Sequence, residues 1–346
     1  MHELGMRTMN SSRLFITCGF ALAALSRWTS PLAFAQGESV IFETVDEVEL
    51  HGTYFPSDQG TKAPCVLMLH DLSDTGSHHG ESEWTLLAKK LQKNGFAVLQ
   101  FDFRGYGKST TVHPAFWKAP YNGKIRGAGQ RPSTIRAADF PAWYMPVLAN
   151  DIAAARRFLD EKNDAKQCNS RNLILIGARE GATLGVLWLA TEWQRRPPRQ
   201  NGVNVPPYGE DVAAAVWLSI LPTMKSSRRP EFQVDKWIAP LRDRTPMLFL
   251  YGEEDRASSG FTTHLCEKIL KIDVPPRLKT TGAKPLATHA AGAGLLTQRS
   301  LGADDKIITY LNNIIPMRDD RDWMDRGVKK AQESFVNLKL FNLPSP

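Results

Sequence analysis

The sequence has few cysteines, no long apolar run and no block of like charges. Its 346 residues include four cysteines, and no two of them are spaced as C-x-x-C, which excludes zinc ribbons and thioredoxin-like redox motifs. No apolar run reaches the roughly 20 residues that a membrane-spanning helix needs. The net charge is +7, but the basic residues stand in scattered pairs. We therefore predict a solvated basic surface and no nucleic-acid binding.

The first 35 residues have the pattern of an export signal. Arg7 and Arg13 precede an apolar run at 14–25, and the tripeptide A-F-A at 33–35 supplies small residues where a signal peptidase reads them. We expect cleavage before Gln36, a secreted or periplasmic location, and no stable membrane insertion after cleavage. An uncleaved N-terminal anchor is the alternative interpretation.

The few cysteines also bear on the mature chain. Without the signal segment three of them are left, which permits at most one disulfide and one free thiol. Cys65 lies inside an apolar run and is expected to be a buried, unreactive thiol. The candidate disulfide is therefore Cys168–Cys266. A lipid-modified Cys18 is a further alternative to cleavage of the signal segment.

Short apolar runs alternate with helical periodicity between residues 40 and 315. Continuous apolar runs are typical of strands buried on both faces, and apolar residues at helical spacing indicate helices. The alternation predicts an α/β fold, with a mostly parallel sheet of about eight strands and helices on both faces. An antiparallel hairpin at 40–54 is expected at its start. The other expected strands are 64–70, 96–103, 173–176, 212–220, 247–251 and 277–281, and the expected helices are 82–94, 145–160, 181–195 and 304–315.

Two segments break this alternation. Residues 106–145, which we call the insertion, are rich in glycine, proline, arginine and aromatic residues, and long irregular stretches in compact domains are usually functional. We expect the insertion to pack as a partial lid over the carboxyl edge of the sheet, because its large aromatic rings would be costly to expose. These rings are Trp117, Tyr121, Trp143 and Tyr144. The second segment, residues 316–346, is expected to form an amphipathic helix followed by a loose tail.

Four motifs follow strands in a fixed order. They are His70-Asp71-Leu72, the D-x-R-G-x-G-x-S run at 102–109, Gly177-Ala178-Arg179-Glu180-Gly181 and Gly252-Glu253-Glu254-Asp255. This series resembles the α/β-hydrolase superfamily, and within it the dienelactone-hydrolase and serine-aminopeptidase-like branches, over about residues 40–315. The resemblance implies an α/β-hydrolase fold for residues 36–315. Gly107-Lys108-Ser109 is not a phosphate-binding loop, because Asp102 stands where that loop needs a glycine.

The resemblance also implies which residues hold the site positions. The centre of G-x-S-x-G, where the family places its nucleophile on a sharp turn, is Arg179 in this sequence. Asp255 matches the family's acid. His289 follows in the right chain order for the family's histidine, and Lys284 is the alternative at that position.

Two of these positions oppose acyl transfer. A guanidinium stays protonated and has no nucleophilic lone pair, so Arg179 cannot form an acyl-enzyme. The family's oxyanion hole would use the backbone N–H groups of Leu72 and Glu180. Asp71 stands where the family usually has glycine, and its negative charge opposes a developing oxyanion. We therefore predict a non-catalytic pseudo-hydrolase. Its Arg179 is expected to pair with the carboxylate of Asp71, Asp255 or Glu180, or else to extend into solvent.

Two alternatives compete with this interpretation. An active ester or amide hydrolase would need an unconventional nucleophile, such as Ser219 at the end of a buried strand. A binding protein would use Arg179 to hold a small anionic ligand at the start of a helix, where backbone N–H groups also favour anions.

No motif indicates NAD, flavin, haem or nucleotide, so we expect no cofactor. The loop with His78, His79 and Glu81 has metal-ligating residue types, but adjacent histidines rarely point to one ion, so we expect no metal.

Overall fold

The computed structural model describes residues 36–72, 82–196, 206–224, 233–272, 280–318 and 320–327. The predicted signal segment, the loop with His78, His79 and Glu81, and residues 328–346 lie outside the described residues. In the part of the chain that is described, no helix has both the length and the apolar character needed to cross a membrane.

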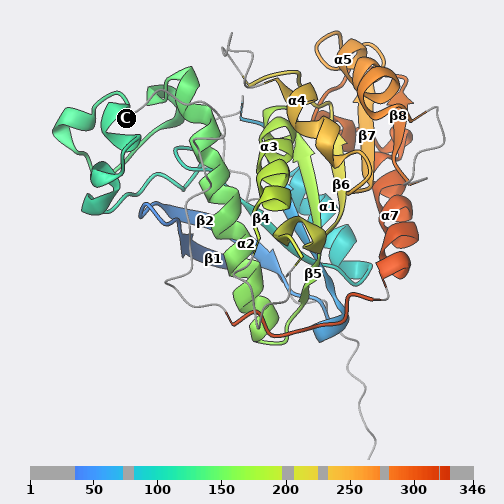
Figure 1. Cartoon of the computed structure of the whole chain (residues 1–346), viewed down its shortest axis with the longest axis horizontal. Coiled ribbons are helices and arrows are strands. Elements are labelled where there is room, and N and C mark those ends of the chain that lie inside the picture. The colour runs from blue at the N-terminus through green and yellow to red at the C-terminus, as the bar shows by residue number, and fades with distance from the viewer. Residues whose placement is uncertain are drawn as a thin grey trace, which may run out of the picture. The chain divides into compact units, whose positions relative to one another are not determined.

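Within these residues, eight strands form one sheet (Figure 1). They are β1 (Glu38–Glu43), β2 (Glu49–Phe55), β3 (Pro64–Leu69), β4 (Ala97–Phe101), β5 (Asn169–Ala178), β6 (Val212–Leu218), β7 (Met247–Gly252) and β8 (Gly282–Leu286). Their order is β1-β2-β4-β3-β5-β6-β7-β8. β2 is antiparallel to both β1 and β4, and the other neighbours are parallel. The predicted α/β fold with a mostly parallel sheet is confirmed.

Helices pack on both faces of the sheet because its strands are apolar on both sides. The helices are α1 (Glu83–Lys93), α2 (Ala149–Asp164), α3 (Glu180–Gln194), α4 (Val234–Ile238), α5 (Ser259–His264), α6 (Gly294–Thr297) and α7 (Ala303–Ile314). Alternate residues of a strand point to opposite faces. In β3, Val66 and Met68 join the core under α1 and α7, while Leu67 and Leu69 join the core under α2 and α3.

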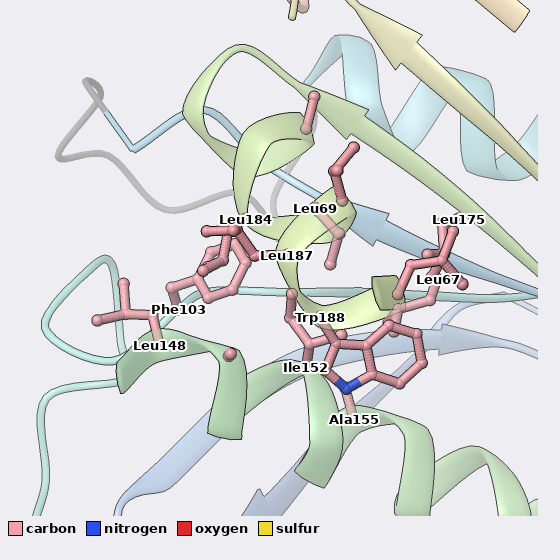
Figure 2. Close-up of a cluster of buried hydrophobic side chains, with 14 of the residues drawn as sticks. Leu67, Leu69, Phe103, Leu148, Ile152, Ala155, Leu175, Leu184, Leu187 and Trp188 are labelled. Carbon is pink, nitrogen blue, oxygen red and sulfur yellow. The ribbon is translucent and has the colours of Figure 1, made fainter. Parts of the chain in front are cut away.

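Figure 2 shows the core between α2, α3 and the sheet. Leu184, Leu187 and Trp188 of α3 pack in one buried cluster with Leu67 of β3 and Ile152 of α2. Nearly every residue of α3 is buried, as expected for a helix that is apolar on all sides. This packing holds the first turn of α3 at the carboxyl edge of β5.

A buried ion cluster anchors the insertion to the rest of the fold. Arg104, which follows β4, is fully buried. Its guanidinium donates to Asp46 Oδ2 at 2.6 Å, in the turn between β1 and β2, and to Asp151 Oδ1 of α2 at 2.7 Å. The insertion joins the same cluster through Tyr144, whose hydroxyl accepts from Arg104 at 3.0 Å, and Asn122, whose amide donates to Asp46 at 2.8 Å. These bonds connect the hairpin, α2 and the insertion.

The large rings of the insertion are not left in solvent. Trp117 and Tyr144 are buried, and Tyr121 and Trp143 are half-buried. The backbone of the insertion bonds to the turn of the first hairpin, and the insertion lies near that hairpin and α2 in Figure 1. Its role as a lid over the site stays a prediction.

The last strand lies later than predicted. β8 spans Gly282–Leu286, whereas the sequence pattern favoured 277–281, of which the described residues 280 and 281 are not in a strand. β8 is an edge strand that pairs with β7 alone, so it tolerates the exposed Lys284 and Pro285. An edge strand of this kind lacks the apolar run that reveals a buried strand.

The chain after α7 does not continue as the predicted amphipathic helix. A short 3₁₀ helix at Ile315–Arg318 is followed by residues 320–327 without regular structure. Arg326 instead forms an ion pair with Asp211, and the indole of Trp323 donates a 3.0 Å hydrogen bond to the backbone of α2. These contacts with other elements stabilise an extended path. The rest of the segment lies outside the described residues.

The predicted disulfide between Cys168 and Cys266 is not formed. Cys65, Cys168 and Cys266 are all free, buried thiols, so the expected buried thiol at Cys65 is confirmed. Cys168 lies directly before β5 and next to Cys65 of β3. Cys266 lies in the π-helix Leu265–Leu270 after α5. The sequence alone does not show which strands are neighbours in the sheet. In the fold, Cys168 lies beside Cys65 and not beside Cys266.

Candidate functional site

Arg179 stands at a sharp turn between β5 and α3, at the carboxyl edge of the sheet. Its backbone has φ 47° and ψ −118°, a strained conformation that costs a non-glycine residue about 1–3 kcal/mol. The turn requires glycine on both sides, because neighbouring backbone atoms leave no room for a Cβ at Gly177 or Gly181. A Cβ on Gly181 would lie 2.1 Å from the carbonyl oxygen of His70, and one on Gly177 would lie 2.7 Å from Ala182 Cα. The expected strand–turn–helix junction is present, with arginine at its apex.

The side chain of Arg179 bridges two carboxylates. Its Nε lies 3.4 Å from Asp71 Oδ2, and its Nη1 lies 3.4 Å from Asp255 Oδ2. Its aliphatic stem packs against Gly292, where an added Cβ would lie 2.9 Å from Arg179 Cγ. The side chain is only 22% exposed. The guanidinium is therefore held between Asp71 and Asp255, as one of the two sequence-based expectations has it, and does not extend into solvent.

Asp255 has partners other than histidine. It lies in the loop after β7, and its Oδ2 accepts a 2.5 Å hydrogen bond from Ser258 Oγ in addition to the bond from Arg179. Its Oδ1 accepts from the backbone N–H of Ala257 at 3.1 Å. In a serine hydrolase this carboxylate orients the catalytic histidine. In this chain a serine hydroxyl and a guanidinium take the lone pairs that a histidine would use.

His289 lies in the loop that directly follows β8. This loop is hydrogen-bonded to the loop that contains Asp255: the backbone N–H of Glu254 donates to the Thr288 carbonyl oxygen at 3.2 Å. His289 is exposed, and no hydrogen bond or ion pair within the described ranges joins it to Asp255. Lys284 lies inside β8. Of the two candidates for the histidine position, His289 is therefore the one in the loop after the last strand.

Two carboxyl groups lie together beside the predicted oxyanion hole. Glu180, the first residue of α3, is 3% exposed, and its Oε2 has no hydrogen-bond partner among the described atoms. Burial, and then the hydrogen bond and charge of Asp71, raise the pKa of Glu180 to about 7. Tyr106 borders the pair, and its hydroxyl donates to the carbonyl oxygen of Leu72 at 2.6 Å. An acidic pair at this place opposes the charge that develops in acyl transfer.

The alternative nucleophile Ser219 has no catalytic partner among the described residues. It follows β6 and is fully buried, with φ 51°. Its hydroxyl makes no hydrogen bond to any described residue. A serine becomes nucleophilic only when a neighbouring base takes its proton. Within the described part of the chain, no base is hydrogen-bonded to Ser219.

The described residues also contain no group of three His, Cys, Asp or Glu side chains placed to hold a metal ion. The loop with His78, His79 and Glu81 lies outside them. The candidate site is thus built from Arg179 and carboxyl groups. Sequence reasoning missed the contributions of Ser258 and Tyr106. The close spacing of Ser258 and Asp255 is a signal for the first, because serine and aspartate side chains often bond within such short turns.

The Glu180→Gln variant is expected to reduce the pH dependence of stability. The pKa of Glu180 is raised in the folded state to about 7, from an unfolded value of about 4.3. The protonated carboxyl therefore contributes stability that is fully present below about pH 4 and is lost as the pH rises through about 7. Glutamine keeps a hydrogen-bond donor for Asp71 without titrating.

Thermal unfolding at a series of pH values measures this effect. Between about pH 5 and pH 8 the wild-type protein should lose a few kcal/mol more stability than the variant does. Glu254→Gln, on an exposed loop at the same edge of the sheet, is the matched control and should follow the wild-type profile. Identical profiles for the wild type and Glu180→Gln would show that burial beside Asp71 does not raise the pKa of Glu180.

Comparison with known proteins bears on the fold. No protein-family model matches the sequence. Over 71 residues the chain is 39% identical to uncharacterized proteins from two strains of Mycobacterium tuberculosis, a match that covers 20% of this chain and 24% of each relative. The match thus spans about a quarter of the length of these curated relatives.

Solved structures match most of the chain. The esterase Pf2001 of Pyrococcus furiosus is 15% identical with a TM-score of 0.52, over 81% of this chain and 91% of that chain. The α/β hydrolase GrgF from a Penicillium species is 12% identical with a TM-score of 0.53, over 82% of this chain and 100% of that chain. Identities this low compare folds and not activities. Together with the sheet order and the turn at residue 179, they show that this chain has the α/β-hydrolase fold.

Proposed function

We propose that this chain is a pseudo-hydrolase, a secreted or periplasmic protein that keeps the hydrolase fold without acyl-transfer catalysis. The observation that carries the proposal is the position of Arg179, which stands at the apex of the turn and bridges Asp71 and Asp255. A guanidinium has no lone pair with which to attack a carbonyl carbon. Loss of a triad nucleophile typically lowers turnover about 10⁶-fold. The proposed location rests on the signal pattern of residues 1–35.

Two further features support the loss of catalysis. Asp255 is bonded to Ser258 and Arg179, so it does not orient His289. Asp71 and Glu180 bring acidic groups to the place where an oxyanion would need hydrogen-bond donors. Attack and proton transfer therefore lack a suitable group among the described residues, and the acidic side chains oppose the stabilisation of an oxyanion.

The charges of the site disfavour the anion-binding alternative. The positive charge of Arg179 already faces the carboxylates of Asp71 and Asp255. A small anion would have to displace one of them and leave a partly buried carboxylate unpaired, which costs several kcal/mol. The paired charges therefore do not favour a small anionic ligand beside Arg179.

Hydrolysis of p-nitrophenyl acetate tests the proposed function. The wild-type protein should not exceed the rate of buffer with an equal amount of denatured protein. Arg179→Ser should stay within roughly tenfold of the wild type, because restoring the serine alone restores neither the histidine contact nor the oxyanion hole. Arg136→Ser, an exposed arginine of the insertion, is the control. Wild-type turnover about 10³-fold above buffer, abolished by Ser219→Ala, would instead establish an active hydrolase with an unconventional nucleophile.

A further inference from the structure

Two cysteines meet at the amino ends of β3 and β5, at the opposite edge of the sheet from Arg179. Pro64 of β3 pairs with Asn169 of β5, and the backbone N–H of Asn169 donates to the Ala63 carbonyl oxygen at 2.7 Å. Cys65 follows Pro64, and Cys168 precedes Asn169. The register shifts after this pair, so Cys65 lies opposite Leu173 in the ladder. The side chains of Cys65 and Cys168 meet in the buried core on one face of the sheet, where the two thiols interact directly.

The surroundings of the two thiols are closed to water. Cys65 and Cys168 are both fully buried. The Cys168 thiol donates a weak 3.6 Å hydrogen bond to the Leu159 carbonyl oxygen of α2, and Tyr54 borders the pair. Burial, and then the neighbouring thiol, raise the pKa of Cys65 well above its usual range. In the folded chain Cys65 is therefore a protonated thiol, and a protonated, buried thiol does not exchange with disulfides.

We propose that Cys65 and Cys168 form a structural disulfide when this chain folds in an oxidising compartment. The thiolate of one cysteine attacks a disulfide of a small molecule or an exchange protein, and one partner thiol leaves. The second cysteine thiolate then attacks the mixed disulfide, and the second partner thiol leaves. The chain loses two electrons and two protons, and the partner disulfide gains them. Because exchange needs exposed thiolates, both steps precede the final closure of β3 against β5.

The bond would cross-link a long stretch of chain. The closed loop from Cys65 to Cys168 contains β4, the insertion and α2. A cross-link that closes a long loop restricts the unfolded chain strongly and so stabilises the folded one. Cys266 lies in another part of the fold and would stay free. The setting of this inference rests on the proposed export, and its chemistry does not depend on the proposed loss of catalysis.

Oxidative refolding tests the disulfide. The full chain is denatured, reduced and refolded with a mixture of oxidised and reduced glutathione, and the remaining thiols are then blocked with N-ethylmaleimide in denaturant. Peptide mass spectrometry should find Cys65 linked to Cys168, with maleimide on Cys18 and Cys266. The melting temperature of the oxidised protein should exceed that of protein refolded in dithiothreitol by roughly 5–10 °C.

Variants separate the bond from other effects of oxidation. Cys168→Ala should lose the rise in melting temperature between reduced and oxidised samples, and Cys266→Ser should keep it. Four maleimide adducts after oxidative refolding, or a linked peptide that contains Cys266, would overturn the proposal. Because glutathione supplies the oxidant, this result is independent of export, and the ester-hydrolysis assay judges the proposed function separately.

Discussion

Replacing Arg104 by alanine is expected to lower the free energy of unfolding by about 3–5 kcal/mol. The side chain is fully buried between Asp46 and Asp151. Without it, two buried carboxylates would have no compensating charge. Even beside Arg104, burial raises the pKa of Asp151 to about 6. The loss should also loosen the insertion, because Tyr144 and Asn122 belong to the same cluster.

Urea unfolding followed by tryptophan fluorescence measures this loss. Arg136→Ala is the matched control, because Arg136 lies in the insertion and pairs with Asp139 at 3.3 Å while its side chain is 78% exposed. Exposed ion pairs contribute about 0–1 kcal/mol, so the control should stay close to the wild type. If Arg104→Ala lost no more stability than the control, the buried cluster would not be the anchor of the insertion.

Replacing Gly181 by alanine is expected to cost about 3 kcal/mol or more, the upper range for inserting an atom into a packed region. An added Cβ would lie 2.1 Å from the His70 carbonyl oxygen and 2.6 Å from that of Leu69. These obstacles are backbone atoms of the last residue of β3 and of the residue that follows it, so no side-chain rotation relieves the clash. The turn would have to open, and Arg179 would move away from Asp71 and Asp255.

A glycine in open space provides the control. Gly260 lies in α5, and an added Cβ there would meet no atom within 4 Å. Alanine has the higher helix propensity, so Gly260→Ala should raise the free energy of unfolding by about 0.5–1 kcal/mol. Both variants are compared by chemical denaturation. A Gly181→Ala protein as stable as the wild type would mean that the turn at Arg179 is looser than the structure indicates.

Periodicity predicted the elements that are buried on at least one face. The runs that form β3, β4 and β6 are apolar because both faces of these strands are covered. Helix α1 begins directly after Ser82, whose side chain caps it. The position of β8 was not predicted correctly, because an edge strand tolerates polar residues such as Lys284 and so lacks a continuous apolar run. The helix predicted after residue 316 is absent from 320–327 because contacts of Arg326 and Trp323 with distant elements outweigh local propensity.

The candidate site was predictable in part. Motif spacing located Arg179 at a strand–helix turn and Asp255 at the end of a strand, because the carboxyl ends of parallel strands share one edge. It did not reveal that the carboxyl group of Glu180 is buried beside Asp71, which raises its pKa. That interaction depends on the burial of Glu180, which follows from the packing of the whole α3 helix and is not encoded in any short motif.

Labelling with a fluorophosphonate tests most directly whether this chain has lost its nucleophile. The probe forms a covalent bond with a serine only where a base activates the hydroxyl, and intact-mass spectrometry counts the adducts. We predict an unmodified mass for the wild-type chain under conditions that label an active serine esterase completely. A stoichiometric adduct on one serine, with ester hydrolysis that disappears when that serine is replaced by alanine, would contradict the assignment of this chain as a pseudo-hydrolase.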